Sequence, residues 1–600
     1  MFRGIGRSTA LLFGFLFVGS ALACGPSTVP SPGSDAGDMG PGDMGPGDPV
    51  PDAGTLDLDV ADADGGEDLG PDASEDAGAP LPEPRFVDVT RAVGLDHDQD
   101  PNFPALCTDA SPVCAEGWQT GGAAAGDLDG DGWPDLYFAV MGGPDRVYLN
   151  DGDGTFTDVS EEWGVARLEN ATSGVAMHDV DRDGDLDVYV SGYGQRRHYL
   201  WLNTGSGLVE RGLALGATPP QDRNVQGQSI AFGDIDADGW ADIYVVEWAY
   251  DHLAGVPRSR TMLLRNRLGE EAGDFDEITA AAGVLADGWP TLDGREGTFG
   301  LTPAFTDLDD DGRQDLYVAA DFGASRIFWN AGDGTFVDGT DAAAVNLATN
   351  AMGLAIGDFD ADGLVDLFVT SISDADESKA LTDWGGNRLY LNQGDRTFQE
   401  DSFRRGVSWG DWGWGTAAED MDHDGDLDLL QTAGWVSRSD GREFLFENDG
   451  TGYFRERGRE VGFGAPGKVG QGRALVLVDY DRDGDSDVLV VRHDDAPILW
   501  RNDLPRRTHW MRLRVLDERG ADALGAQLTI TRDGVTQRRE VRAGGTFNGS
   551  DEPWIDVGFG PVEADVPCEA EVTVRWLGGG EQSATLTCDD WHVLTRASLG

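Results

Sequence analysis

Basic residues are scarce in this chain. Its 600 residues include 44 lysines and arginines against 109 aspartates and glutamates, which gives a formal net charge of −65. So acidic a surface repels the phosphates of nucleic acids and the anionic headgroups of lipids. The composition therefore excludes nucleic-acid binding and electrostatic attachment to membranes.

Cysteines, histidines and known catalytic motifs are also few. The five cysteines include no Cys-x-x-Cys pair, so the sequence does not indicate a zinc site. The eight histidines are spread over the chain, and neither Gly-x-Ser-x-Gly nor His-Glu-x-x-His occurs. These residues therefore predict no catalytic site.

The N-terminus has the pattern of an export signal. Arg3 and Arg7 precede an apolar run over residues 10–18. This run is too short to span a bilayer, but it has the length of the apolar part of a secretory signal peptide. We therefore expect the protein to be exported.

The end of this signal is similar to that of a bacterial lipoprotein. Residues 21–24 read Ala-Leu-Ala-Cys, although Ala21 stands where such signals usually have leucine. We expect residues 1–24 to be a lipoprotein-type signal peptide and Cys24 to carry the lipid, which places the protein at the outer membrane or cell surface. Plain cleavage near Ala23 is the alternative, and the protein would then be secreted or periplasmic.

The other four cysteines form two pairs of sequence neighbours, Cys107 with Cys114 and Cys568 with Cys588. Disulfides form in oxidising compartments outside the cytoplasm, so we expect both pairs to be bonded. Residues 25–84 consist mostly of glycine, proline, aspartate and alanine. Such a composition cannot bury a core, and we expect this segment to be a disordered tether.

One nine-residue pattern, Asp-x-Asp-x-Asp-Gly-x-x-Asp, occurs seven times. Its aspartates, at positions one, three, five and nine, are Asp127, Asp129, Asp131 and Asp135; Asp179, Asp181, Asp183 and Asp187; Asp234, Asp236, Asp238 and Asp242; Asp307, Asp309, Asp311 and Asp315; Asp358, Asp360, Asp362 and Asp366; Asp420, Asp422, Asp424 and Asp428; and Asp479, Asp481, Asp483 and Asp487. Glycine at position six lets the backbone reverse, so the carboxylates face one concavity and repel one another. A hard cation with oxygen ligands relieves that repulsion. We predict that each loop binds one Ca²⁺, up to seven in all, through these side chains and the carbonyl of position seven.

The surroundings of the pattern distinguish it from an EF-hand. An EF-hand loop needs a glutamate at position twelve and a helix on each side, whereas position twelve is apolar or neutral here, as at Phe138. Each loop follows a short apolar run and precedes an alternating one, such as Asp-Leu-Tyr-Phe-Ala-Val from Asp135. The loops are therefore predicted to join two strands of a β-hairpin.

The loops start 51 to 73 residues apart, within a repeat that covers residues 85–505. Each repeat has a third strand ending in asparagine and then a fourth, which is the strand content of a β-propeller blade. The last repeat lacks its fourth strand, but a matching Phe-Val-Asp segment precedes the first loop at residues 86–88. We predict an all-β chain with a seven-bladed propeller, whose N-terminal strand completes the last blade.

Residues 506–600 differ from the repeats. Alternating strands such as Val-Thr-Val-Arg-Trp at 572–576 occur there without an acidic loop. A small β-domain is therefore expected, with Cys568 and Cys588 joining strands near its end.

The motifs resemble a known family. The acidic loops with their Asp-Leu-Tyr and Leu-Tyr-Leu-Asn strands look like the FG-GAP/VCBS repeats of integrin-like propellers. The tail resembles the ASPIC/UnbV domain of cartilage-acidic-protein-like proteins in Leu-Gly-Ala at 524–526, Gly-Phe-Gly at 558–560 and Val-Arg-Trp at 574–576. The family's Gly-Tyr-Ser-Gln-Ser stretch reads Gly-Thr-Phe-Asn-Gly at 545–549, and Leu577 replaces a common proline. The resemblance implies a calcium-dependent extracellular scaffold or adhesion-type protein.

We therefore expect a monomeric cell-surface scaffold that binds a protein or a glycan. A calcium-dependent carbohydrate-active enzyme and a purely structural envelope protein are the alternatives. Trp409, Trp412 and Trp414, with Trp289 and Trp384, could form an aromatic platform for sugar rings. Filling of the gaps between blades is the other interpretation of these tryptophans.

Overall fold

The computed structural model describes residues 85–599, except 96, 98–118, 167–170, 195–196, 220–224, 251–260, 271–272, 287–288, 293, 295–296, 374–384, 436–440, 465–469, 494, 504–507 and 563–565. The expected lipidation of Cys24, the tether over residues 25–84, the disulfide of Cys107 with Cys114, and Trp384 lie outside the described residues. The described residues belong to one compact unit of the chain, residues 78–600. None of the described helices is long and apolar enough to cross a membrane.

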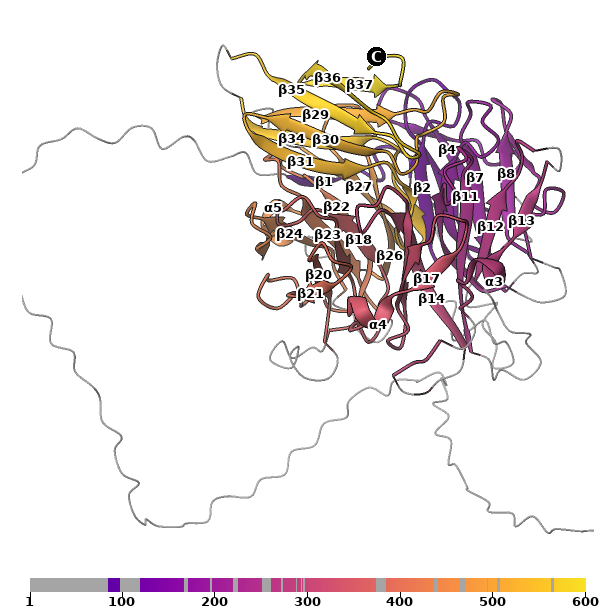
Figure 1. The fold of residues 1–600 in the computed structure, drawn as a ribbon. Helices are drawn as coiled ribbons and strands as arrows, with labels where there is room; N and C mark the ends of the chain where they lie inside the picture. Colours follow the sequence, from indigo (N-terminus) through magenta and orange to yellow (C-terminus); the bar gives the residue numbers. More distant parts are fainter. Residues whose placement is uncertain are drawn as a thin grey trace, which may run out of the picture. The chain divides into compact units, whose positions relative to one another are not determined.

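The strands before residue 503 form seven antiparallel units of four (Figure 1). Units 1 to 3 are β2 (Gly122–Gly126), β3 (Asp135–Ala139), β4 (Arg146–Asn150) and β5 (Phe156–Asp158); β6 (Thr172–His178), β7 (Asp187–Gly192), β8 (Tyr199–Asn203) and β9 (Leu208–Glu210); and β10 (Gly227–Gly233), β11 (Asp242–Tyr250), β12 (Met262–Asn266) and β13 (Phe275–Glu277). Units 4 and 5 are β14 (Gly297–Thr306), β15 (Asp315–Ala320), β16 (Arg326–Asn330) and β17 (Phe336–Asp338); and β18 (Leu354–Gly357), β19 (Asp366–Val369), β20 (Arg388–Asn392) and β21 (Phe398–Glu400). Units 6 and 7 are β22 (Gly413–Glu419), β23 (Asp428–Ala433), β24 (Phe444–Asn448) and β25 (Phe454–Glu456); and β26 (Gly472–Val478), β27 (Asp487–Arg492), β28 (Ile498–Asn502) and β1 (Phe86–Asp88).

Short helices follow the fourth strands of three units: α3 (Thr279–Ala282), α4 (Thr340–Ala343) and α5 (Gly458–Val461). Each helix ends in a residue with left-handed backbone conformation, which is Gly283 after α3. Such a residue reverses the chain at a helix end, and glycine adopts it without strain. The helices therefore act as turns between units.

The seven units close into a ring, which makes this part of the chain a β-propeller. The first strand of each unit contacts the first strand of the next, and β26 of the last unit contacts β2 of the first. Apolar clusters fill the spaces between neighbouring units; the one between units 7 and 1 contains Leu489, Leu499, Leu136 and Phe138. The arrangement is consistent with the seven blades predicted from the sequence.

The N-terminal strand β1 pairs with β28 at the outer edge of the last unit, with Phe86 opposite Asn502. The last unit thus gets its fourth strand from the start of the chain, as the sequence analysis expected. Phe86 packs on Phe463 of unit 6, with ring centroids 4.9 Å apart. The two ends of the propeller sequence are therefore joined within one blade.

Residues 508–599 form a C-terminal domain of two sheets that enclose one apolar core, drawn in orange and yellow in Figure 1. One sheet has the order β34 (Ile555–Pro561), β29 (Thr508–Val515), β37 (Asp590–Leu594). The other has the order β31 (Val535–Glu540), β30 (Gln527–Arg532), β35 (Glu569–Arg575), β36 (Glu581–Thr587). The predicted disulfide between Cys568 and Cys588 is present.

Two further strands, β32 (Ala543–Gly544) and β33 (Gly549–Ser550), leave this domain between β31 and β34. β32 pairs with β10 and β33 pairs with β2, both of which are first strands of propeller units. We call residues 542–551 the channel segment. Since it also contacts the first strands β6 and β26, it lies in the channel that these strands surround.

Candidate metal-binding loops and the channel

The acidic loops connect the first and second strands of each unit, and we number them 1 to 7 with their units. In loop 2, both oxygens of Asp179 accept backbone N–H groups of the loop, from Asp183 at 3.1 Å and from Gly184 at 3.0 Å. Asp187, at position nine, accepts the N–H of Val180 at 3.0 Å and that of Asn203 at 2.8 Å. These bonds hold two carboxylates of the loop in fixed directions before any ligand is considered.

The aspartates at positions one, three and nine come together in loops 1, 2, 3 and 5, with one oxygen of each within 4.8 Å of the others. In loop 4 the group is formed by Asp307, Asp309 and Asp311, at positions one, three and five. In these five loops the fourth predicted side chain is thus not part of the same tight group. Metal binding by these residues remains a prediction.

The position-three aspartates carry the clearest sign that the loops suit a cation. In six loops one of their oxygens is buried without a hydrogen-bond partner among the described residues: Oδ1 of Asp181, Asp236, Asp360, Asp422 and Asp481, and Oδ2 of Asp309, which forms an ion pair with Arg396. A buried carboxylate oxygen without a partner is costly, and native structures rarely keep one. The same defect repeated at the same position is what a shared oxygen-binding cation would remove.

Burial also disfavours the charged form of several loop aspartates. It raises the pKa of Asp135 to about 8, and the charges of Asp129 and Asp127 add to the rise. It raises the pKa of Asp234 to about 7, with a contribution from the charge of Asp238. A divalent cation would offset both effects, so the donor set of carboxylate oxygens fits Ca²⁺.

The asparagine that ends each third strand links neighbouring loops, a role that sequence reasoning missed. Its backbone N–H donates to the position-nine aspartate of its own unit, as Asn203 does to Asp187. Its side-chain amide donates, at 2.7 to 3.0 Å, to the position-two carbonyl of the preceding loop. The seven pairs are Asn150 with Tyr480, Asn203 with Leu128, Asn266 with Val180, Asn330 with Ile235, Asn392 with Leu308, Asn448 with Phe359 and Asn502 with Met421. The recurrence of asparagine at one position of every repeat was the available signal.

We expect Asn203→Ala to lower the free energy of unfolding by about 1–3 kcal/mol, because the buried carbonyls of Leu128 and Leu186 lose their donor. Urea denaturation of the variant measures the change. Thr204→Ala alters the next, exposed residue and is the control, with an expected change below about 0.5 kcal/mol. Equal effects of the two substitutions would show that the asparagine does not link the loops energetically.

The C-terminal domain rests on the loops themselves. Arg575 donates to Asp307 and Asp310 of loop 4, both at 2.9 Å. In loop 6 the N–H of Gly558 donates to Asp420 at 2.9 Å. These acidic loops are therefore also the surface on which the second domain docks.

Loop 7 makes the most buried of these contacts. Arg512 lies 2.9 Å from Asp479, and their side chains are 3% and 0% exposed. Glu552 lies 3.7 Å from the same arginine and accepts the N–H of Asp479 at 3.0 Å. A buried guanidinium depends on its acidic partners, because removing one of them leaves an uncompensated charge.

The tip of the channel segment is completely enclosed. Phe547 has no exposed surface and packs on Trp414, with ring centroids 5.2 Å apart. The N–H of Asn548 donates to Ser229 at 2.7 Å, and its side-chain amide donates to the carbonyl of Gln119 at 3.0 Å. The segment thus fills the channel with both polar and apolar contacts.

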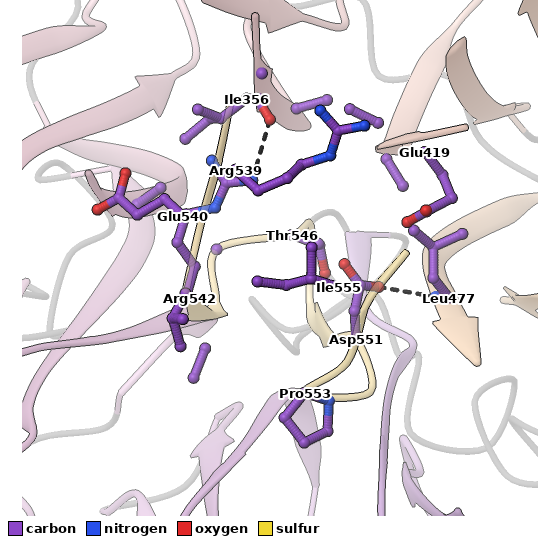
Figure 2. A pocket seen from close by; sticks show the side chains of 18 of the residues that line it. Ile356, Glu419, Leu477, Arg539, Glu540, Arg542, Thr546, Asp551, Pro553 and Ile555 are labelled. Carbon is purple, nitrogen blue, oxygen red and sulfur yellow. Dashed lines mark hydrogen bonds between the residues drawn. The ribbon is translucent and has the colours of Figure 1, made fainter. Parts of the chain in front are cut away.

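A cavity of about 150 Å³ lies between the channel segment and the strands β18, β22 and β26 (Figure 2). Glu419, Arg539 and Asp551 line it. Burial raises the pKa of Glu419, and it raises the pKa of Asp551 to about 6, although Asp551 accepts the N–H of Leu477 at 2.8 Å. Its walls come from both domains, so the cavity exists only while they are docked.

The described tryptophans do not form one platform. Trp409 packs on Phe444 and Trp289 on Phe328, within the clusters between units. Trp412 stacks instead on Trp435, with centroids 4.8 Å apart, near the channel. Filling of the spaces between blades therefore accounts for two of these side chains.

Comparisons with known proteins agree with this architecture. The model of the FG-GAP-like repeat matches residues 127–190, 179–245, 307–369 and 379–430, and the ASPIC and UnbV model matches residues 517–593. Cartilage acidic protein 1 of Homo sapiens is 25% identical over 546 residues, which are 84% of this chain and 73% of that protein. The Mus musculus protein is 24% identical over 559 residues, 86% of this chain and 77% of that protein.

Among solved structures, the SapL1 lectin in complex with alpha methyl fucoside has a TM-score of 0.30 and 12% identity, covering 55% of this chain and 95% of its own. The Dos1 propeller has a TM-score of 0.29 and 9% identity, covering 74% and 92%. The repeats, the tail domain and the relatives together define the architecture. The chain is an FG-GAP repeat propeller with a C-terminal ASPIC and UnbV domain, similar to cartilage acidic protein 1.

Proposed function

We propose that this protein is an exported propeller scaffold whose loops bind calcium and which binds a protein or a glycan at the cell surface. The observation that carries the calcium site is the buried oxygen without a hydrogen-bond partner at position three of six loops. The N-terminal signal and the lipobox-like residues 21–24 support export and a lipid anchor on Cys24. The net charge of −65 supports a calcium-rich setting outside the cytoplasm.

The calcium ion would have a structural role. The aspartates at positions one, three and nine would hold it, and its charge would offset the repulsion among them. Because the asparagine links join each loop to the next unit, fixing one loop also fixes its neighbour. Loading the loops would therefore stabilise the whole ring that presents the binding surface.

Calcium removal is the test. Sites of extracellular type bind with dissociation constants of roughly 10⁻⁴ to 10⁻³ M, so each loaded loop adds about 1–3 kcal/mol at about 10 mM calcium. We expect chelation to lower the melting temperature of the full chain strongly, calcium to restore it, and elemental analysis to count up to seven ions per chain. No bound ion and no shift would refute the metal site.

Two substitutions in loop 2 make this test specific. Asp181→Asn removes the carboxylate whose oxygen is buried without a partner, and we expect one ion per chain to be lost. Asp185→Asn makes the same charge change at position seven, whose side chain is not a predicted ligand, and the ion count should not change. Loss of an ion from both variants would point to overall charge instead of the predicted ligands.

A further inference from the structure

The C-terminal domain donates hydrogen bonds to, or forms ion pairs with, the first aspartate of three loops. Arg575 reaches Oδ2 of Asp307, the N–H of Gly558 reaches Oδ2 of Asp420, and Arg512 lies 2.9 Å from Oδ2 of Asp479. Asp307 also belongs to the group of oxygens that converge in loop 4, and Asp420 and Asp479 accept backbone N–H groups of their own loops. One carboxylate therefore faces the loop interior and the second domain at the same time.

The direction of these carboxylates depends on the conformation of their loops. Without a cation, four carboxylates within one turn repel one another, and the turn that places Oδ2 against the C-terminal domain is destabilised. With a cation the repulsion is offset and the loop keeps the shape that the domain contacts. Binding of the cation and docking of the domain then favour the same loop conformation, which is positive coupling.

The channel segment follows the docked domain because it continues directly from β31. On that strand Arg538 donates to Asp310 of loop 4 at 2.9 Å and to the carbonyl of Gly363 in loop 5 at 2.8 Å. Arg542, at the start of the segment, donates to the carbonyl of Ile356 beside loop 5 at 3.0 Å (Figure 2). Loops 4 and 5 therefore hold the chain immediately before it enters the channel.

We propose that the cation-loaded loops hold the C-terminal domain in place and so keep its channel segment inserted, and that loss of the cations withdraws the segment and opens the channel. This inference rests on the proposed calcium binding by the loops. The channel segment is then a plug whose insertion depends on the calcium concentration. The acidic loops of the propeller and the arginines on the strands of the C-terminal domain connect calcium binding to the position of the segment.

Hydrogen exchange of the full chain tests the plug over a series of free calcium concentrations. The reporter amides are Gly545, bonded to the carbonyl of Ile230, and Asn548, bonded to Ser229. Amides of β27, inside a blade, are the reference. We expect the reporters to exchange at least about fivefold faster at a calcium concentration where β27 is still protected. Opening of the reporters and of β27 at one common calcium concentration would overturn the inference.

A matched pair of variants separates docking from loop charge. Arg575 of the C-terminal domain and Arg396 of the propeller both pair with loop 4, and both are partly exposed. Arg575→Gln should raise the calcium concentration at which the reporters open by at least about fivefold. Arg396→Gln removes a positive charge that competes with the cation at Asp309 and Asp311, so it should not raise that concentration. Equal shifts would mean that loop charge alone sets the effect, which contradicts the proposed plug.

Counting ions in the same samples distinguishes the two proposals. If no calcium binds, the proposed function fails and the plug mechanism fails with it. If calcium binds and its removal leaves the exchange of Gly545 and Asn548 unchanged, only the plug mechanism fails.

Discussion

Phe547→Ala is expected to lower the free energy of unfolding by about 3–5 kcal/mol, the range for removing a phenylalanine from a well-packed core. Phe547 is fully buried in the channel, among Trp248, Phe299 and Trp414. The ring of first strands is closed on all sides, so it cannot collapse around the space that the side chain leaves. Urea denaturation of the calcium-loaded full chain measures the loss.

Phe403→Ala is the matched control, because it deletes the same atoms from a side chain that is 59% exposed. Its expected effect is within about 0.5 kcal/mol. If Phe547→Ala were equally mild, the tip of the channel segment would be loosely held in solution. That result would contradict the close packing of Phe547 on Trp414.

The repeats of this fold were predictable because their signals are local. Strand, acidic loop, strand and asparagine follow one another within each repeat, and glycine at position six marks the turn. The missing fourth strand of the last repeat and the extra Phe-Val-Asp before the first loop were enough to predict β1 beside β28. Each of these inferences needed only a pattern and its repetition.

The channel segment could not be predicted in this way. Asn548 bonds to Ser229, more than 300 residues earlier, and no periodic pattern connects the two. Its sequence, with Gly544 and Gly545 at positive φ, reads locally as an ordinary turn. Only the assembled ring creates the hole that gives this turn a place.

The surface on which the C-terminal domain docks could not be predicted from the sequence for a related reason. Arginines that alternate with apolar residues, such as Arg512 in β29, read as the solvated face of an edge sheet. In the structure the side chain of Arg512 is 3% exposed and lies beside Asp479 and Glu552. A chain with 109 acidic residues offers no sequence clue to which of them an arginine will meet.

Deleting residues 85–95 should have the second large effect, because it removes the strand that closes the ring. Phe86, Val89, Val93 and Leu95 are all buried, and burial of a large apolar side chain contributes about 1.5–3 kcal/mol. The deletion also exposes the edge of β28, and an unpaired edge strand promotes association of chains. We expect a much lower melting temperature in calcium and oligomers in size-exclusion chromatography.

Adding a peptide of residues 85–95 in trans distinguishes ring closure from general damage. If β1 acts by completing the last blade, the peptide should pair with β28, raise the melting temperature again and suppress the oligomers. A deleted chain that is monomeric and as stable as the full one would show that the asparagine link from Asn150 to Tyr480 and the apolar cluster between units 7 and 1 close the ring without β1. The two contributions to closure, strand pairing and loop linkage, are thereby measured against each other.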